Sequence, residues 1–470
     1  MTTLNQDIYS LKLAIHALTP QEKAPFSSHE TLSQLAKISR IALPLLKGLD
    51  TLFFHIKCIN HCFSLITGYC IALKVLPFSW IYSHNHVIHL AARLTAKQIT
   101  CLQMMRLNPD DASSYFNLAL SLTDPHQNVV IGNKPWNQKS LYLEAININP
   151  NLAEAYLHLG NTLSSEDCTT LLNGVVMTEQ ELYLKAIDLC TKELDLNPKA
   201  LDLNPILAEA YLNLGVTLSD KETISIDGLE VTDQDLYCDA IDLNPHLAEA
   251  YLNLGSTLSL DETATLLDNR VMTRGELYLE ALKLDPSLGE AYFNLAGLLL
   301  PNETVTLNGI TYSEKMLYLK CIELESAEAE AYFDLGTLLE DHETITLSNG
   351  SSLTKQALYL KAIEKDPNFL DAYFNLALTL SDQETVTLLD GIPLNQQKIA
   401  LKMIDLDASY QDAYHLLIKT FSEDQEDITL LNETLLSRDA LLKKVSPQPL
   451  QSKRKSIGSS FVKKSPLKTE

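Results

Sequence analysis

This 470-residue sequence lacks the residue sets typical of a catalytic or metal centre. It contains no glycine-rich phosphate loop, no nucleophile elbow and no HExxH motif. His84, His86 and His89 cluster, but no cysteine or carboxylate completes a metal site, so we interpret them as part of a polar loop. We therefore expect a protein that is not an enzyme and that holds no cofactor and no metal.

A long hydrophobic run is also missing. The most apolar stretch, Leu52–Leu76, contains Lys57 and Lys74 with only sixteen residues between them, and a transmembrane helix needs about 20 apolar residues. We interpret the stretch as a buried helix of a helical N-terminal region, 1–94. Membrane association through 52–76 remains the alternative.

The N-terminal residues show no targeting pattern, and the cysteines show no disulfide pattern. The start of the chain has no basic run followed by an apolar core, as a signal peptide would have. The eight cysteines are scattered, and Cys168, Cys238 and Cys321 lie in apolar surroundings within the repeats described below. We expect these three to be buried thiols in a reducing compartment, and the protein to be cytoplasmic.

Basic residues are scarce, because 36 Lys and Arg stand against 60 Asp and Glu, a net charge of −24. The exception is the C-terminus, where 443–470 hold eight Lys or Arg and the single acid Glu470. We predict that 446–470 form a disordered basic tail, either solvated or folded back onto the acidic body. The acidic body disfavours nucleic acid and favours a basic protein or peptide as partner.

What the sequence does contain is a repeat. Its marker is a tyrosine within segments such as AEAYLNLGSTL, and successive markers are 41, 55, 40, 41, 40, 41 and 41 residues apart. A fixed period of this size indicates a repeat protein. The markers are Tyr115, Tyr156, Tyr211, Tyr251, Tyr292, Tyr332, Tyr373 and Tyr414.

Each repeat consists of three parts. A first helix carries the marker and, four residues later, a small residue such as Gly255, which would let another helix approach closely. A middle segment such as ETVTLNGITY (303–312) alternates β-branched and apolar residues around Asn-Gly, which predicts a β-hairpin. A second helix opens with a capping box, Thr273 with Glu276 or Thr178 with Glu181, and ends near a proline.

The helical parts resemble the tetratricopeptide repeat in Tyr251, Leu254, Gly255, Tyr278, Ala281 and Pro286 of one unit. The resemblance implies a mainly α protein, an α-solenoid of helix–hairpin–helix repeats, over 95–445 with eight full repeats and a partial one. The family repeat has 34 residues, so about seven extra residues per unit go to the hairpin. Two departures are a tyrosine in place of tryptophan in the first helix and a second helix that starts about a turn late.

Two local features leave alternatives open. Hairpins of successive units could merge into one sheet, with Val305 and Leu307 inward and Thr304 and Thr306 outward, or each could pack on its own helices. The 55-residue interval repeats LDLNP at 194–198 and 201–205. This duplication is either an extended helix end or bulge, or a functional hinge.

Two polar rows accompany the marker tyrosines and form the candidate binding site. One row lies two residues after each marker, and the other lies two residues before it. This spacing predicts that both rows lie on one helix face, outside the apolar stripe. A primary amide can donate to and accept from a peptide backbone, so we predict a groove for an extended, basic chain. The candidate residues are Asn117, His158, Asn213, Asn253, Asn294, Asp334 and Asn375 in one row, with Glu209, Glu249 and Glu290 in the other.

We therefore interpret the chain as a non-enzymatic scaffold that binds protein segments along the solenoid. One alternative is a chaperone or adaptor for exported or membrane-associated clients. Another is a membrane-associated regulatory adaptor anchored through 52–76. The client and the oligomeric state do not follow from the sequence.

Overall fold

The computed structural model describes residues 95–442, except 125–126, 132–133, 165–166, 198, 201–202, 220, 382–383, 389–390, 392, 421–426, 430–434 and 439–440. The predictions for 1–94, for the three histidines and for 446–470 lie outside these residues. The chain divides into two compact units, 1–103 and 104–470. Within 1–103 the structure describes residues 95–103, and all of these except Thr95 belong to helix α5 (Ala96–Leu107).

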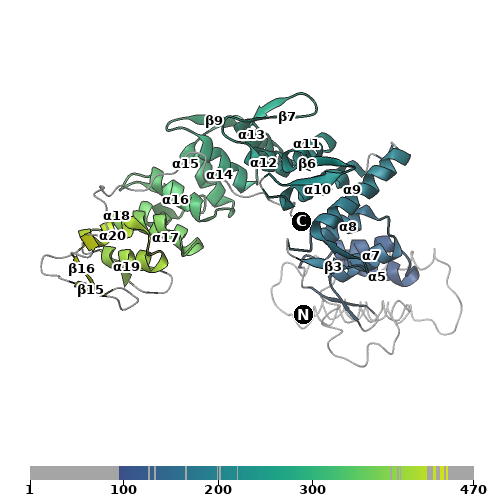
Figure 1. Ribbon diagram of the computed structural model, residues 1–470, viewed down its shortest axis with the longest axis horizontal. Coiled ribbons are helices and arrows are strands. Elements are labelled where there is room, and N and C mark those ends of the chain that lie inside the picture. Colours follow the sequence, from purple (N-terminus) through teal and green to yellow (C-terminus); the bar gives the residue numbers. More distant parts are fainter. Residues whose placement is uncertain are drawn as a thin grey trace, which may run out of the picture. The chain divides into compact units, whose positions relative to one another are not determined.

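The described part of 104–470 is a mainly helical solenoid in which helices follow one another in pairs (Figure 1). We number the repeats one to eight after the marker tyrosines Tyr115 to Tyr414. The first helices are α6 (Ala112–Leu120), α8 (Ala153–Gly160), α10 (Asn204–Thr217), α12 (Ala248–Thr257), α14 (Gly289–Leu298), α16 (Ala329–Leu338), α18 (Leu370–Thr379) and α20 (Gln411–Lys419). The second helices are α7 (Gln138–Ile148), α9 (Glu179–Leu196), α11 (Asp233–Leu243), α13 (Arg274–Leu284), α15 (Glu314–Glu323), α17 (Lys355–Lys365) and α19 (Gln396–Leu406).

In repeats one to seven a two-stranded hairpin separates the two helices, and in repeat eight a hairpin follows α20. The hairpins are β1–β2 (Val129–Ile131, Lys134–Trp136), β3–β4 (Cys168–Thr170, Val176–Thr178), β5–β6 (Thr223–Ile226, Leu229–Thr232), β7–β8 (Thr263–Thr265, Val271–Thr273), β9–β10 (Thr304–Leu307, Ile310–Ser313), β11–β12 (Thr344–Thr346, Ser352–Thr354), β13–β14 (Val386–Thr387, Pro393–Leu394) and β15–β16 (Asp427–Thr429, Leu435–Ser437). The predicted order of helix, hairpin and helix is therefore confirmed, including in repeats without an Asn-Gly or Asp-Gly turn.

The hairpins do not merge. In the described residues every strand pairs with one partner strand, that of its own hairpin, so the merged sheet is wrong. In repeats one and five an aromatic side chain of the hairpin lies beside the marker tyrosine of its own first helix. Tyr312 of β10, for example, has its ring centroid 6.1 Å from that of the marker Tyr292. Val305 and Leu307 face inward and Thr304 and Thr306 outward, as their alternation predicts.

The last residue of each hairpin also starts the second helix. Thr273 ends β8 and is the N-cap of α13, where its side chain accepts a hydrogen bond from the Glu276 N–H. In return, the Thr273 N–H donates a hydrogen bond to Glu276 Oε2. This reciprocal pair satisfies two donors that the helix leaves without partners. The predicted capping boxes at Thr273 and Thr178 are both present.

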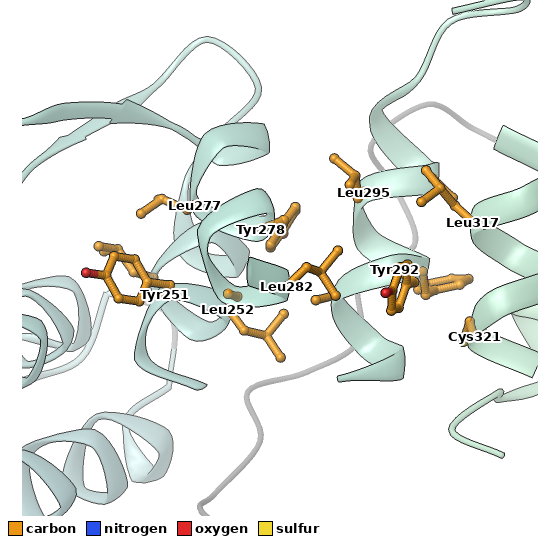
Figure 2. Packing of buried hydrophobic residues seen from close by; sticks show 14 of the residues in the cluster. Tyr251, Leu252, Leu277, Tyr278, Leu282, Tyr292, Leu295, Leu317 and Cys321 are labelled. Atoms are coloured by element: carbon orange, nitrogen blue, oxygen red, sulfur yellow. The ribbon is translucent and has the colours of Figure 1, made fainter. Parts of the chain in front are cut away.

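The core runs from repeat to repeat, because each first helix packs on two second helices. Helix α12 contacts α13 of its own repeat and α11 of the preceding one. Figure 2 shows Leu282 of α13 and Tyr292 of α14 in the interface between repeats four and five. The small residue of the first helix lies against the second-helix tyrosine, and a Cβ added at Gly255 would be 2.7 Å from Cε1 of Tyr278. The predicted close approach is confirmed.

The duplicated LDLNP lengthens two helices. Helix α9 has 18 residues, whereas α11 and α13 have 11. The first copy forms its last turn, and Asn204 and Pro205 of the second copy begin α10. The extension of a helix end is therefore confirmed, and the hinge stays a prediction.

Candidate binding site on the first helices

The row of amides is buried, and the prediction that it lies outside the apolar stripe is wrong for five of its residues. Their relative exposures are between 0% and 3%. The reason is the double packing of each first helix, since the second helix of the preceding repeat covers the face that a single helix pair would leave open. The five residues are Asn213, Asn253, Asn294, Asp334 and Asn375.

Several of these buried groups hydrogen-bond to the preceding repeat. Asn213 Nδ2 donates to Asn161 Oδ1 at 3.0 Å, and Asn294 Nδ2 donates to Ser256 Oγ at 3.3 Å. The Tyr318 hydroxyl donates to Asp334 Oδ2 at 3.0 Å. A buried polar group is tolerated when it is hydrogen-bonded. The row therefore ties repeat three to repeat two, repeat five to repeat four and repeat six to repeat five.

The second-helix tyrosine is the usual neighbour of this row. Asn375 Nδ2 lies 3.5 Å from the Tyr359 hydroxyl. In both Tyr318–Asp334 and Tyr359–Asn375 the tyrosine precedes the row residue by sixteen positions. That fixed separation is the sequence signal that would have revealed a structural role for the row.

The first two repeats depart from this arrangement. Asn117 is exposed, and its Nδ2 donates to Ser113 O within α6 at 2.8 Å. His158 is half-buried, and its ring stacks on Tyr142 with centroids 5.9 Å apart and lies beside Phe116. Burial lowers the pKa of His158 to about 4. Its imidazole is therefore neutral at pH 7 and belongs to the packing between the two repeats.

The acidic row is the part of the predicted site that reaches solvent. Glu209, Glu249 and Glu290 are half-buried on α10, α12 and α14. Burial raises the pKa of Glu209, and repulsion from Glu249 of the next repeat raises it further, against the lowering effect of Asn161, whose Nδ2 lies 3.4 Å from Glu209 Oε1. Burial also raises the pKa of Glu249, with a further contribution from Asp285.

Glu209 and Glu249 form no ion pair in the described residues, and Glu249 is near enough to raise the pKa of Glu209. In the part of 104–470 that the structure describes, the ion pairs involve other carboxylates, and no lysine or arginine pairs with Glu209 or Glu249. Two carboxylates that repel each other in a partly desolvated place favour a cation that neutralises them.

Two further sets of periodic polar residues were not singled out in the sequence, and both are structural. The residue after the N-cap of the second helix covers the end of the first helix, as when Arg274 Nε donates to Gly255 O at 3.0 Å. The acid before each hairpin accepts from the backbone three residues earlier, as Glu343 does from the Glu340 N–H. Glu343 also pairs with Lys315 of the preceding repeat at 2.7 Å.

The cysteines differ from expectation in one respect. Cys321 is buried, and burial raises the pKa of its thiol to about 12. Cys238 is half-buried, and burial raises its pKa to about 11. Cys168 is exposed at the start of β3, so the prediction that it is buried is wrong. It occupies an outward position of the alternating strand, where a Thr stands in other repeats.

In the described residues, no group of three or more His, Cys, Asp or Glu lies close enough to hold a metal ion. None of the helices described is both long enough and apolar enough to span a membrane.

Comparison with known proteins points to one repeat family. Residues 358–398, from α17 through α18 to the start of α19, match the model of the tetratricopeptide repeat. Among solved structures, the crystal structure of the yeast Tom70 is 15% identical, covers 84% of this chain and 78% of that chain, and has a TM-score of 0.27. No curated protein matches the sequence significantly.

Proposed function

We propose that this chain, whose residues 358–398 match the tetratricopeptide repeat, is a non-enzymatic scaffold that binds a basic, extended protein segment along its first helices. The observation that carries the proposal is the pair Glu209 and Glu249. Both carboxylates have raised pKa values and neither has a cationic partner in the described residues. A Lys or Arg side chain of a partner would relieve their repulsion.

The amide row contributes to this function indirectly. Its buried members fix each first helix against the preceding repeat, and this sets the spacing of the acids on successive helices. A partner that meets one acid per repeat must itself be extended, because a compact fold presents few side chains at a regular period. The proposed site is thus the row of acids, with Glu209 and Glu249 at its centre.

An adaptor for exported or membrane-associated clients is a narrower form of the same proposal, since such clients expose extended segments before they fold. We also propose a cytoplasmic location. In its support, the described cysteines are free thiols, and those at positions 190 and 321 are buried, which raises the pKa of each to about 12 and makes them unreactive.

The test measures binding of an oligolysine peptide to the full chain by fluorescence anisotropy. The variant Glu209→Gln/Glu249→Gln removes two charges from the proposed site. Its matched control, Glu193→Gln/Asp195→Asn, removes two charges from exposed positions at the end of α9. We expect about tenfold weaker binding in the first variant and a small change in the control. Equal weakening in both would reduce the site to a net-charge effect and contradict the proposal.

A further inference from the structure

The ends of four consecutive hairpins expose large aliphatic side chains. Leu172 in repeat two is 57% exposed, Leu229 in repeat three 70%, Leu267 in repeat four 61% and Ile310 in repeat five 53%. Val176 and Val271 lie beside the leucines of repeats two and four and are exposed as well. Single exposed aliphatic residues are ordinary, but their recurrence near the turns of four neighbouring hairpins, at the start of the turn in repeats two and four and after it in repeats three and five, needs a reason.

Turn geometry does not supply that reason. Repeats three and five have two-residue turns, in which Asp227, Gly228 and their counterparts all have positive φ. Repeats two and four have three-residue turns that close with a hydrogen bond from Leu171 N to Val175 O and from Leu266 N to Arg270 O. Both types of turn constrain the backbone dihedrals, but neither requires an aliphatic residue at the exposed positions.

Repeat six shows that a polar residue fits the same turn. Its hairpin closes through the equivalent bond, from Leu347 N to Ser351 O at 2.8 Å. By this bond, Ser348 and Ser352 are the counterparts of Leu267 and Val271. Serine at these places supports the same three-residue loop, so the aliphatic side chains of repeats two and four serve something other than hairpin formation.

The surroundings of these side chains specify the chemistry of a partner. The hairpin segments 164–178, 219–232, 259–273 and 300–313 contain ten Asp or Glu and only two Lys or Arg. Each described strand pairs within its own hairpin, so each keeps one edge without a strand partner. An edge of this kind accepts an extended segment through backbone hydrogen bonds, while alternate side chains give specificity.

We propose that the hairpin ends of repeats two to five are a docking surface for a basic, extended segment with aliphatic side chains spaced along it. This inference rests on the proposed function and adds to it the apolar half of the recognition. The aliphatic side chains of the partner contact Leu172, Leu229, Leu267 and Ile310, and its Lys or Arg side chains face the acids around them. A second copy of the chain is disfavoured as the occupant, because each copy carries a net charge of −24.

The test uses the full chain and three synthetic peptides, of alternating Lys and Val, of alternating Lys and Ser, and of alternating Glu and Val. The variant Leu172→Ser/Leu229→Ser/Leu267→Ser/Ile310→Ser installs the residue type of repeat six at all four ends. Because all four side chains are more than half exposed, the variant keeps the thermal stability of the parent chain. The control, Leu196→Ser, changes an 83% exposed leucine at the end of α9.

We expect the Lys–Val peptide to bind the parent chain and the control about tenfold more tightly than the serine variant, since four aliphatic contacts are lost. The Lys–Ser peptide binds all three weakly and equally, and the Glu–Val peptide does not bind. Full affinity of the serine variant for Lys–Val, or equal binding of Lys–Val and Lys–Ser to the parent chain, overturns the inference.

Two further outcomes separate this inference from the proposed function. If the serine variant keeps its affinity while Glu209→Gln/Glu249→Gln loses it, the hairpin surface is wrong and the acidic row stands. If no basic peptide binds the parent chain, the proposed function fails with it. A dimer in sedimentation velocity that the serine variant dissociates would assign the hairpin ends to a second copy and would contradict the basic partner.

Discussion

Tyr318 on α15 donates a hydrogen bond to Asp334 on α16, 3.0 Å away and buried, and so links repeat five to repeat six. Tyr237 occupies the corresponding place in repeat three, is fully buried, and has a hydroxyl without a hydrogen-bond partner. Val216 stands on α10 where Asn161 and Ser256 stand in repeats two and four, and those two residues meet the tyrosine hydroxyls there. Two chemically identical side chains therefore contribute differently to stability.

Replacing these tyrosines by phenylalanine tests the difference directly. Tyr318→Phe leaves a buried carboxylate without one of its donors and should lower the free energy of unfolding by about 1–3 kcal/mol. Tyr237→Phe removes a hydroxyl that has no partner and should be neutral or stabilising. Chemical denaturation of both variants checks the prediction, and equal destabilisation would show that the Tyr318–Asp334 bond is of no importance.

Gly255 and Gly275 give a matched pair within one repeat. A methyl group at Gly255 would lie 2.7 Å from the buried ring of Tyr278, so Gly255→Ala should destabilise by about 1–3 kcal/mol. At Gly275 the nearest atom is 3.6 Å away, an ordinary contact, and Gly275→Ala should stabilise the start of α13 by about 0.5–1 kcal/mol. Thermal unfolding measures both, and a neutral Gly255→Ala would contradict the close packing of α12 on α13.

His158 should make stability depend on pH. Its pKa is lowered to about 4 in the folded chain from 6.5, so the unfolded chain binds a proton between these values and the folded chain does not. The contribution of His158 to the free energy of unfolding is complete above pH 6.5. It falls as the pH decreases toward 4, by at most about 3 kcal/mol. His158→Asn, which installs the residue of most other repeats, should flatten the curve in this range. An unchanged slope would contradict the burial of the imidazole.

Glu209 should show the opposite dependence. Because its pKa is raised in the folded chain, the stability it contributes is present below pH 4.5 and is lost as the pH rises through the folded value. Glu209→Gln should therefore raise the melting temperature at pH 7 and change it little at pH 4. The same variant should bind basic peptides more weakly. Loss of stability at pH 7 would show that the carboxylate has a structural cation partner.

The repeats and their hairpins could be predicted from the sequence because their causes are local. Asn308-Gly309 sets the turn, Thr273 with Glu276 starts the following helix, and the period of the marker tyrosine shows where each unit begins. Each cause acts within a few residues of its effect. These elements therefore appear at their expected places in the structure.

The amide row could not be placed in the same way, because its burial depends on a second neighbour. If α14 packed on α15 alone, Asn294 would lie outside the apolar stripe of α14. Because α13 of the preceding repeat also packs on α14, Asn294 is fully buried. Helical periodicity describes one face at a time. The separate hairpins could not be predicted either, because the choice between them and a merged sheet depends on contacts such as Tyr292–Tyr312, which join a hairpin to its own first helix.

Hydrogen exchange of the full chain with and without the Lys–Val peptide tests the central claim most directly. Binding of a basic, extended segment should slow amide exchange in the hairpin strands of repeats two to five and in the first helices that carry Glu209 and Glu249. Exchange rates that stay unchanged throughout the repeats at saturating peptide, or protection confined to other elements, would contradict the account.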